Sequence, residues 1–157
     1  MPTFEEARKI ILDNVVPLGL EKVEILSAVG RVLAEDVAAP WDMPLWDNTA
    51  MDGYAVHADD CPEDAVLKLE GFLPAGGHMT EKVARGIAVK ILTGAPIPPG
   101  ADAVIPFEEA EEKDGRVFVK KAVKAGDHIR FKGEDVKTGE TVLPSGTVLR
   151  PSEISML

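Results

Sequence analysis

Proline and glycine interrupt this sequence so often that only short regular elements fit between them. The chain holds 12 prolines and 14 glycines among 157 residues, and turn-forming groups such as Pro74–Gly77, Pro98–Gly100 and Asp114–Gly115 separate its apolar runs. These residue types favour turns because they supply or fix backbone angles that others avoid. An Asp-Gly pair between two runs is also typical of a tight β-hairpin. The pattern predicts a predominantly β fold.

Six runs in the middle of the chain have the composition of strands. Six short strands at this spacing predict a small barrel or a curled sheet. The runs are Tyr54–His57, Val66–Phe72, Ile87–Leu92, Ala103–Phe107, Arg116–Val119 and His128–Phe131.

The ends of the chain contain the predicted helices. Thr3 and Glu6 form a capping box before apolar residues at helical spacing, and Pro17 with Gly19 is expected to end that helix. Pro151 suits the entry of a second helix. Because that helix stops at Leu157, short of the roughly 11 residues of a mean helix, we expect the natural chain to continue. Three further elements are predicted: strands at Glu21–Leu26 and Arg31–Val37, and a hairpin at Thr141–Leu149 that turns at Pro144–Gly146.

The charge and the composition exclude several classes of function. A net charge of −10 disfavours a nucleic-acid partner, and the single Cys61 excludes an intrachain disulfide framework and a multi-cysteine zinc site. The acidic start lacks the basic region of a signal peptide, and no apolar run reaches the roughly 20 residues of a membrane span. The expected location is cytoplasmic.

Three segments carry candidate chemistry, and each also has a purely structural interpretation. Asp47–Tyr54 places two carboxylates, an amide and a hydroxyl beside tryptophans that we expect to be packed down; it suits a divalent cation, or it is a capped turn. The Gly/Pro loop Leu92–Asp102 offers backbone N–H groups near Gly94 that can meet an oxyanion, or it is a rigid turn. The basic stretch Lys120–Lys132 attracts phosphate, or it is a solvated edge strand.

Together these segments resemble one family, the molybdopterin molybdenumtransferases, which include the MoeA proteins and the gephyrin E-domain. Pro44–Val56 resembles the family signature Asp-Asn-Ser-Ala-Met-Asp-Gly-Tyr-Ala, with Trp46 in place of Phe and Thr49 in place of Ser. Leu92–Val104 is similar to a second signature, and Arg130–Val136 to a third. The likeness covers nearly the whole chain in the expected order.

This resemblance implies an enzyme that inserts molybdenum from molybdate into adenylylated molybdopterin and releases AMP. It implies an α+β, predominantly β fold in which a small β-barrel-like second domain, residues 39–132, is inserted into an elongated discontinuous first domain, residues 1–38 and 133–157. The family forms homodimers of four-domain subunits, and its third and fourth domains lie outside this chain. We therefore expect the chain alone to be inactive.

The resemblance also assigns residues and partners. Asp52, Thr93 and Asp135 fall on family positions implicated in activity. Asp52 is expected to hold Mg²⁺ or another divalent cation, Thr93 to hydrogen-bond a phosphate or molybdate oxygen, and Asp135 to orient neighbouring basic groups. Cofactor contacts are expected from the same segments, at Asn48, Gly94, Arg130 and Glu134. The expected partners are the pterin substrate, a second copy and other proteins of molybdenum cofactor biosynthesis, without nucleic acid or membrane.

Two other functions fit the same pattern. One is a non-catalytic dimerisation or scaffold module, a role that gephyrin shows the family can take. The other is a stand-alone oxyanion-binding barrel. A nucleotide-binding-like domain downstream in the reading frame favours the enzyme, whereas a stop after Leu157 favours the module. Equilibrium binding of molybdate tests the barrel.

Overall fold

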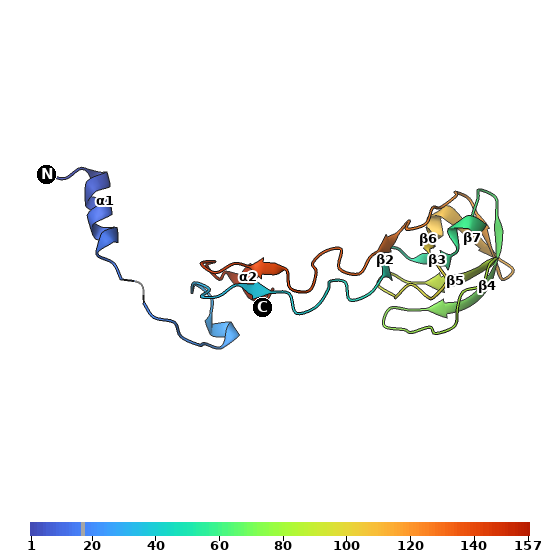
Figure 1. Cartoon of the computed structure of the whole chain (residues 1–157). Helices are drawn as coiled ribbons and strands as arrows, with labels where there is room; N and C mark the ends of the chain where they lie inside the picture. The colour runs from blue at the N-terminus through green and yellow to red at the C-terminus, as the bar shows by residue number, and fades with distance from the viewer. Residues whose placement is uncertain (17) are drawn as a thin grey trace. The chain divides into compact units, whose positions relative to one another are not determined.

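The structure, a computed structural model, describes residues 1–16 and 18–157 of the chain (Figure 1). Its contacts define two compact units, Met1–Val37 with Thr141–Leu157, and Ala38–Glu140. The domain bounds implied by the resemblance, 1–38 with 133–157 and 39–132, stay a prediction.

A six-stranded sheet forms the body of the unit Ala38–Glu140. Its strand order is β6-β3-β5-β4-β8-β7; β4 and β5 run parallel, and the other neighbours run antiparallel. The pairing of β4 with β5 shifts register between Leu69 and Phe72. The strands are β3 (Gly53–Val56), β4 (Val66–Leu73), β5 (Ile87–Ile91), β6 (Ala103–Pro106), β7 (Ala110–Lys113) and β8 (Arg116–Val119).

The end of this sheet formed by β6 and β3 is buried on both faces. Successive strand side chains point to opposite faces, and along β3 Tyr54 and Val56 belong to one apolar cluster while Ala55 belongs to another. On β6, Ile105 and Val104 divide in the same way. All residues of both strands are buried. Burial on two faces therefore fixes the position of β3, which begins directly after Asp52.

The sheet is curled into a half-barrel, which confirms the predicted predominantly β fold class. Three strands separate β3 from β7 in the sheet order, yet the Tyr54 hydroxyl of β3 donates to Glu112 of β7 over 2.9 Å. Curvature brings these side chains together, since right-handed twist accumulates across neighbouring strands. The Asp114–Gly115 hairpin joins β7 to β8 as predicted, with positive φ at both residues.

A narrow two-stranded ribbon accompanies the sheet in the same unit. β2 (Asn48–Thr49) pairs antiparallel with β9 (Ile129–Arg130), and Met43 forms an isolated bridge to Val136. Three short 3-10 turns complete the order of elements along the chain: η1 (Ile25–Ser27), η2 (Ala58–Asp60) and η3 (Phe107–Glu109).

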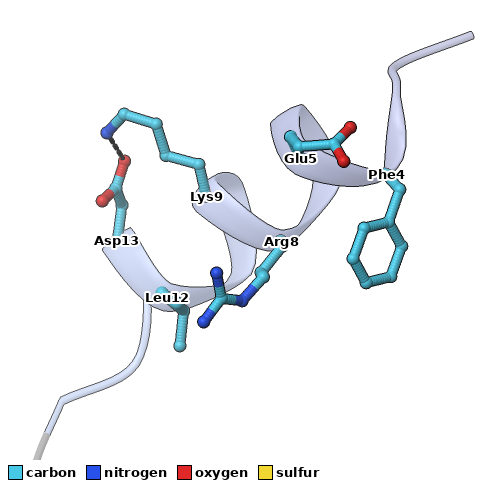
Figure 2. Close-up of a pocket in the computed structure, with 6 residues that line it drawn as sticks. All are labelled: Phe4, Glu5, Arg8, Lys9, Leu12 and Asp13. Carbon is cyan, nitrogen blue, oxygen red and sulfur yellow. Dashed lines mark hydrogen bonds and ion pairs between the residues drawn. The ribbon is translucent and has the colours of Figure 1, made fainter.

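The unit that contains both chain ends has two helices and little core. The helix α1 (Phe4–Asp13) has the predicted capping box, in which the Thr3 hydroxyl accepts from the Glu6 N–H and the Thr3 N–H donates to the Glu6 carboxylate. None of its residues is buried. Figure 2 shows a shallow hollow on this helix between Phe4, Arg8 and Leu12, with Lys9 paired to Asp13 at 2.7 Å. This hollow contains no candidate site residue.

Several predicted boundaries in this unit were wrong. The helix α1 ends at Asp13, with Asn14 as its C-cap, before the expected stop; Pro17 lies outside the described residues. Glu21–Leu26 forms no strand and ends in η1. The second helix, α2 (Pro151–Ile154), begins at proline as predicted.

The hairpin predicted at Thr141–Leu149 has its turn but not its pairing. The strand β10 (Thr141–Leu143) pairs with β1 (Val37–Ala38), and Val148 bridges to Val32. The two predicted arms of the hairpin therefore pair with residues about a hundred positions away and not with each other. The local pattern of a strand does not specify its partner. Within the described residues, no helix is long and apolar enough to cross a membrane.

Candidate functional site

Asp52 and Thr93 meet where two neighbouring strands end. Gly53 at the start of β3 lies opposite Ile91 at the end of β5. The backbone N–H and the hydroxyl of Thr93 both donate to Oδ1 of Asp52, each over 2.7 Å. We call this arrangement the Asp52 clamp. The structure thus brings together two of the three residues that the family resemblance singled out.

The clamp keeps Asp52 ionised. The pKa of this carboxyl is lowered below its usual value, first by the N–H of Thr93 and then by its hydroxyl, because both bonds favour the charged form. Its second oxygen, Oδ2, has neither a donor nor a cation within bonding distance among the described residues. Asp52 therefore presents one unshared anionic oxygen on an exposed side chain.

The loop after Thr93 does not offer the free N–H groups that the sequence suggested. Gly94 donates to the Thr49 carbonyl over 2.9 Å, and Ala95 donates to the Leu92 carbonyl over 2.9 Å. Both donors of Thr93 are directed to Asp52. The prediction of free N–H groups for an oxyanion was therefore wrong here, because each of these groups already donates to a partner. Gly94 keeps a positive φ and open space beside its Cα.

Arg130 is held by two carboxylates from its own segment. Its Nε donates to Glu134 over 2.9 Å, and its Nη2 donates to Asp135. The second oxygen of Glu134 accepts from the Phe131 N–H over 2.8 Å. These carboxylates, Asp135 first, raise the pKa of Arg130. The two carboxylates hold the guanidinium in place, and together they more than balance its charge.

The other basic residues of the stretch 120–132 are also paired in part. Lys121 contacts Glu109 at 2.5 Å, and Lys132 contacts Asp42 at 3.3 Å. This pattern favours the structural interpretation of the basic stretch over a free phosphate-attracting face.

The strand β2 connects the Asp52 clamp with Arg130 and its two carboxylate partners, Glu134 and Asp135. Thr49 is 1% exposed; its N–H donates to the Ala95 carbonyl and its own carbonyl accepts from Gly94. Its neighbour Asn48 lies opposite Arg130 in the pairing with β9. Three segments that are far apart in the sequence therefore converge on two residues.

The prediction that the tryptophans of this region are packed down was wrong, because these and other apolar side chains are exposed. Trp41 is 55% exposed and Trp46 is 53% exposed. Leu45, Met51 and Phe131 are also largely exposed. These residues lie in segments held by backbone hydrogen bonds rather than by a core beneath them, such as the bond from Gly133 to the Pro44 carbonyl.

This site offers a metal ion a single ligand, so the ion's other ligands must come from elsewhere. No group of three or more His, Cys, Asp or Glu side chains that could hold a metal is found among residues 1–16 and 18–157. The unshared oxygen of Asp52 is one hard ligand of the kind Mg²⁺ prefers, and Mg²⁺ commonly completes its shell with water and substrate phosphates.

Sequence inspection missed a second clamp with the same geometry. The N–H and hydroxyl of Thr138 both donate to Oδ1 of Asp42, over 2.8 and 2.9 Å. Lys132 lies 3.3 Å from its Oδ2. We call this arrangement the Asp42 clamp. An aspartate ten residues before Asp52 was visible in the sequence, but nothing local pointed to Thr138, 96 positions away.

The comparisons with known proteins agree with the fold over nearly the whole chain. Residues 2–157 match the MoeA N-terminal region, domains I and II. The molybdopterin molybdenumtransferase of Haemophilus influenzae is 38% identical over 159 residues, which cover 100% of this chain and 39% of that protein. The corresponding protein of Synechococcus elongatus is 35% identical, over 98% of this chain and 40% of its own length.

A solved structure gives the same result. The crystal structure of the molybdopterin biosynthesis MoeA protein of Pyrococcus horikoshii OT3 has a TM-score of 0.91 and 43% identity, over 98% of this chain and 42% of that one. The fold and the family match together define the class of this chain, a β-rich region of the MoeA N-terminal kind. The chain belongs to the molybdopterin molybdenumtransferase family, as its MoeA N-terminal region. It spans about 40% of the length of the curated relatives it matches.

Proposed function

We propose that this chain is the N-terminal part of an enzyme that inserts molybdenum from molybdate into adenylylated molybdopterin and releases AMP. The Asp52 clamp is the observation that supports this proposal, because it presents an ionised carboxylate oxygen without a partner in the described chain. The relatives named above are molybdopterin molybdenumtransferases. We propose the same activity for the whole protein to which this region belongs.

In this proposal Asp52 is the catalytic carboxylate and a ligand of a divalent cation. When bound there, such a cation would supply positive charge to phosphate oxygens. Thr93 holds Asp52 ionised and in place, since both of its donors are spent on that carboxylate. This positioning task replaces the expected bond from Thr93 to a substrate oxygen.

Asp135 and Glu134 have a parallel task at Arg130. They fix the guanidinium beside Asn48, which lies opposite it in the ribbon. An anionic substrate group can then exchange with one carboxylate for the planar guanidinium, which binds two oxygens at once. Asn48 and Gly94 flank this position as cofactor contacts. The remaining contacts come from family domains outside this chain, and the family's homodimer is proposed for the full-length protein.

The test uses a full-length enzyme that carries this region. Asp52→Asn keeps the clamp's acceptor oxygen but removes the charge, and we expect it to retain the fold while cofactor formation and AMP release fall by at least a hundredfold, on the order of removing one electrostatic stabiliser. Asp42→Asn is the matched control and should retain activity. Normal molybdoenzyme reconstitution by Asp52→Asn contradicts the role of Asp52.

The 157-residue chain alone should release no AMP from adenylylated molybdopterin. Detectable release by the isolated chain contradicts the proposal that the contacts from other family domains are required.

A further inference from the structure

Glu112 joins three strands of the half-barrel through one oxygen. Its Oε2 accepts from the Tyr54 hydroxyl of β3 over 2.9 Å and from the Lys90 ammonium of β5 over 2.8 Å. Tyr54 and Lys90 lie directly opposite each other in the pairing of these strands. Tyr54 is 3% exposed, whereas the side chains of Lys90 and Glu112 are 36% and 37% exposed. The carboxylate thus covers the buried tyrosine at the edge of the core.

Phe107 connects this group with Asp52. Its ring lies edge to face on Tyr54, with ring centroids 5.1 Å apart and planes at 65°, and the Lys90 ammonium lies 5.3 Å from the ring centroid. Such aromatic and cation–π contacts each stabilise one arrangement of the ring. The backbone N–H of Phe107 donates to the Asp52 carbonyl over 3.2 Å. Asp52 is therefore held at its carbonyl by Phe107 and at its carboxylate by Thr93.

The chemistry of the group keeps it assembled at neutral pH. Lys90 first, and then Tyr54, lowers the pKa of Glu112, so the acceptor stays ionised. Burial, with Glu112 beside it, raises the pKa of Tyr54 to about 12, so the hydroxyl stays a donor. Both groups therefore keep these protonation states at neutral pH.

We propose that Glu112 is a positioning residue for Asp52, acting through Tyr54, Lys90 and Phe107. This inference rests on the proposed role of Asp52 as the catalytic carboxylate. Glu112 makes no contact with Asp52 itself. It fixes the ring of Phe107, the backbone of Phe107 fixes the Asp52 carbonyl, and the carboxylate is thereby kept within reach of Thr93.

Amide hydrogen exchange of the 157-residue chain tests the inference, with Thr93 as the reporter and Thr138 as the internal control. Both amides donate to an aspartate in the same way, but only Thr93 depends on Asp52. The variants are Glu112→Ala, which removes both bonds, Tyr54→Phe, which removes only the hydroxyl, and Glu112→Gln, which keeps an acceptor for that hydroxyl.

We expect exchange at Thr93 to quicken roughly fivefold in Tyr54→Phe and about 25-fold in Glu112→Ala, the scale of one and two lost hydrogen bonds. Exchange at Thr138 should change by less than about twofold, because its own bond is intact. Glu112→Gln should restore part of the protection at Thr93. These readings require no cofactor, so they stand or fall separately from the activity of Asp52→Asn.

Two outcomes overturn the inference. One is unchanged exchange at Thr93 in all three variants. The other is an equal rise at Thr93 and Thr138, which indicates general loosening of the fold. If Glu112→Ala does not fold, Tyr54→Phe decides by the same comparison, because removing one hydroxyl leaves the ring in the core.

Discussion

Asp42 and Asp52 are each held by the N–H and the hydroxyl of a threonine, and they differ in what contacts their second carboxylate oxygen. In each clamp a threonine N–H and its hydroxyl donate to Oδ1 within 2.9 Å. Lys132 lies 3.3 Å from Oδ2 of Asp42, whose side chain is 25% exposed. In the described chain no cation meets Oδ2 of Asp52, and that side chain is exposed.

The difference separates a structural carboxylate from one that can act on a ligand. A carboxylate carries acceptor sites on both oxygens. At Asp42 donors from the protein occupy both oxygens, and the clamp joins two distant segments of the ribbon. At Asp52 the same clamp uses one oxygen and orients the other. The clamp is therefore not evidence of function by itself; the unshared oxygen is the distinguishing feature.

The two aspartates also differ in their supports. Asp52 is followed by Gly53, whose backbone packs so closely on β6 that an added Cβ would lie 2.1 Å from the Ile105 carbonyl oxygen. Asp42 precedes Met43, which forms an isolated bridge to Val136. The site aspartate is thus anchored by a sheet buried on both faces, and the structural one by a thin ribbon.

The largest expected effect comes from Gly53→Ala. Because the clash is with backbone atoms, β3 and β6 must separate, and we expect a loss of about 3 kcal/mol in the free energy of unfolding. Thermal or urea unfolding measures it. The amide signal of Thr93 should move in the folded variant while that of Thr138 stays.

Gly19→Ala is the control for this substitution. An added Cβ there meets nothing within 4 Å, and its stability should stay within about 0.5 kcal/mol of the parent. If Gly53→Ala unfolds like the control, the close approach does not anchor Asp52.

A smaller effect is expected from removing one threonine hydroxyl. Thr93→Val should raise the pKa of Asp52, because that hydroxyl is the second cause of its low value. Thr138→Val should raise the pKa of Asp42 too, because its hydroxyl is likewise the second cause of the low value there. Carbon-detected NMR titration of both carboxyls measures the two shifts. An unchanged pKa in either variant contradicts the account of that clamp.

The sign of the accompanying pH dependence follows from the depressed pKa values. Each ionised aspartate contributes stability above the pKa of the unfolded chain, about 3.9, and this contribution is lost as the pH falls through the lower folded-state pKa. Both valine variants should therefore lose stability relative to the parent at neutral pH, and this difference should shrink as the acid range is entered.

The smallest effect is expected from Lys132→Met. Its ammonium is a lesser cause of the low pKa of Asp42 than the two donors of Thr138. The pKa of Asp42 should rise slightly and that of Asp52 should not change. A shift at Asp52 in the same titration would show that the clamps are coupled, contrary to their separate supports.

Much of the fold was predictable because its signals are local. The capping box at Thr3, the Asp114–Gly115 turn and the runs that became β3, β4, β5, β6 and β8 depend on neighbours within a few residues. The pairing of β10 with β1 was not predictable, because a strand's partner is chosen by distant residues. The stretch 110–113 also became a strand, β7, which is not among the six runs predicted as strands.

The candidate site was predictable in its residues and not in its bonds. The signature segments pointed to Asp52 and Thr93, and the structure joins them. The sequence suggested free N–H groups at Gly94, yet Thr49 accepts from that group across the β2 segment. Hydrogen-bond partners separated by 40 or more positions, such as Tyr54 and Glu112, leave no periodic trace in a sequence.

The most direct test of the unshared oxygen in the Asp52 clamp is a Mg²⁺ titration of the 157-residue chain, followed at the carboxyl carbons of Asp52 and Asp42. A cation that takes hard oxygen ligands should find the unshared oxygen first. We predict a saturable shift at Asp52 with no matching shift at Asp42. An equal response at Asp42, or none at Asp52, contradicts the account.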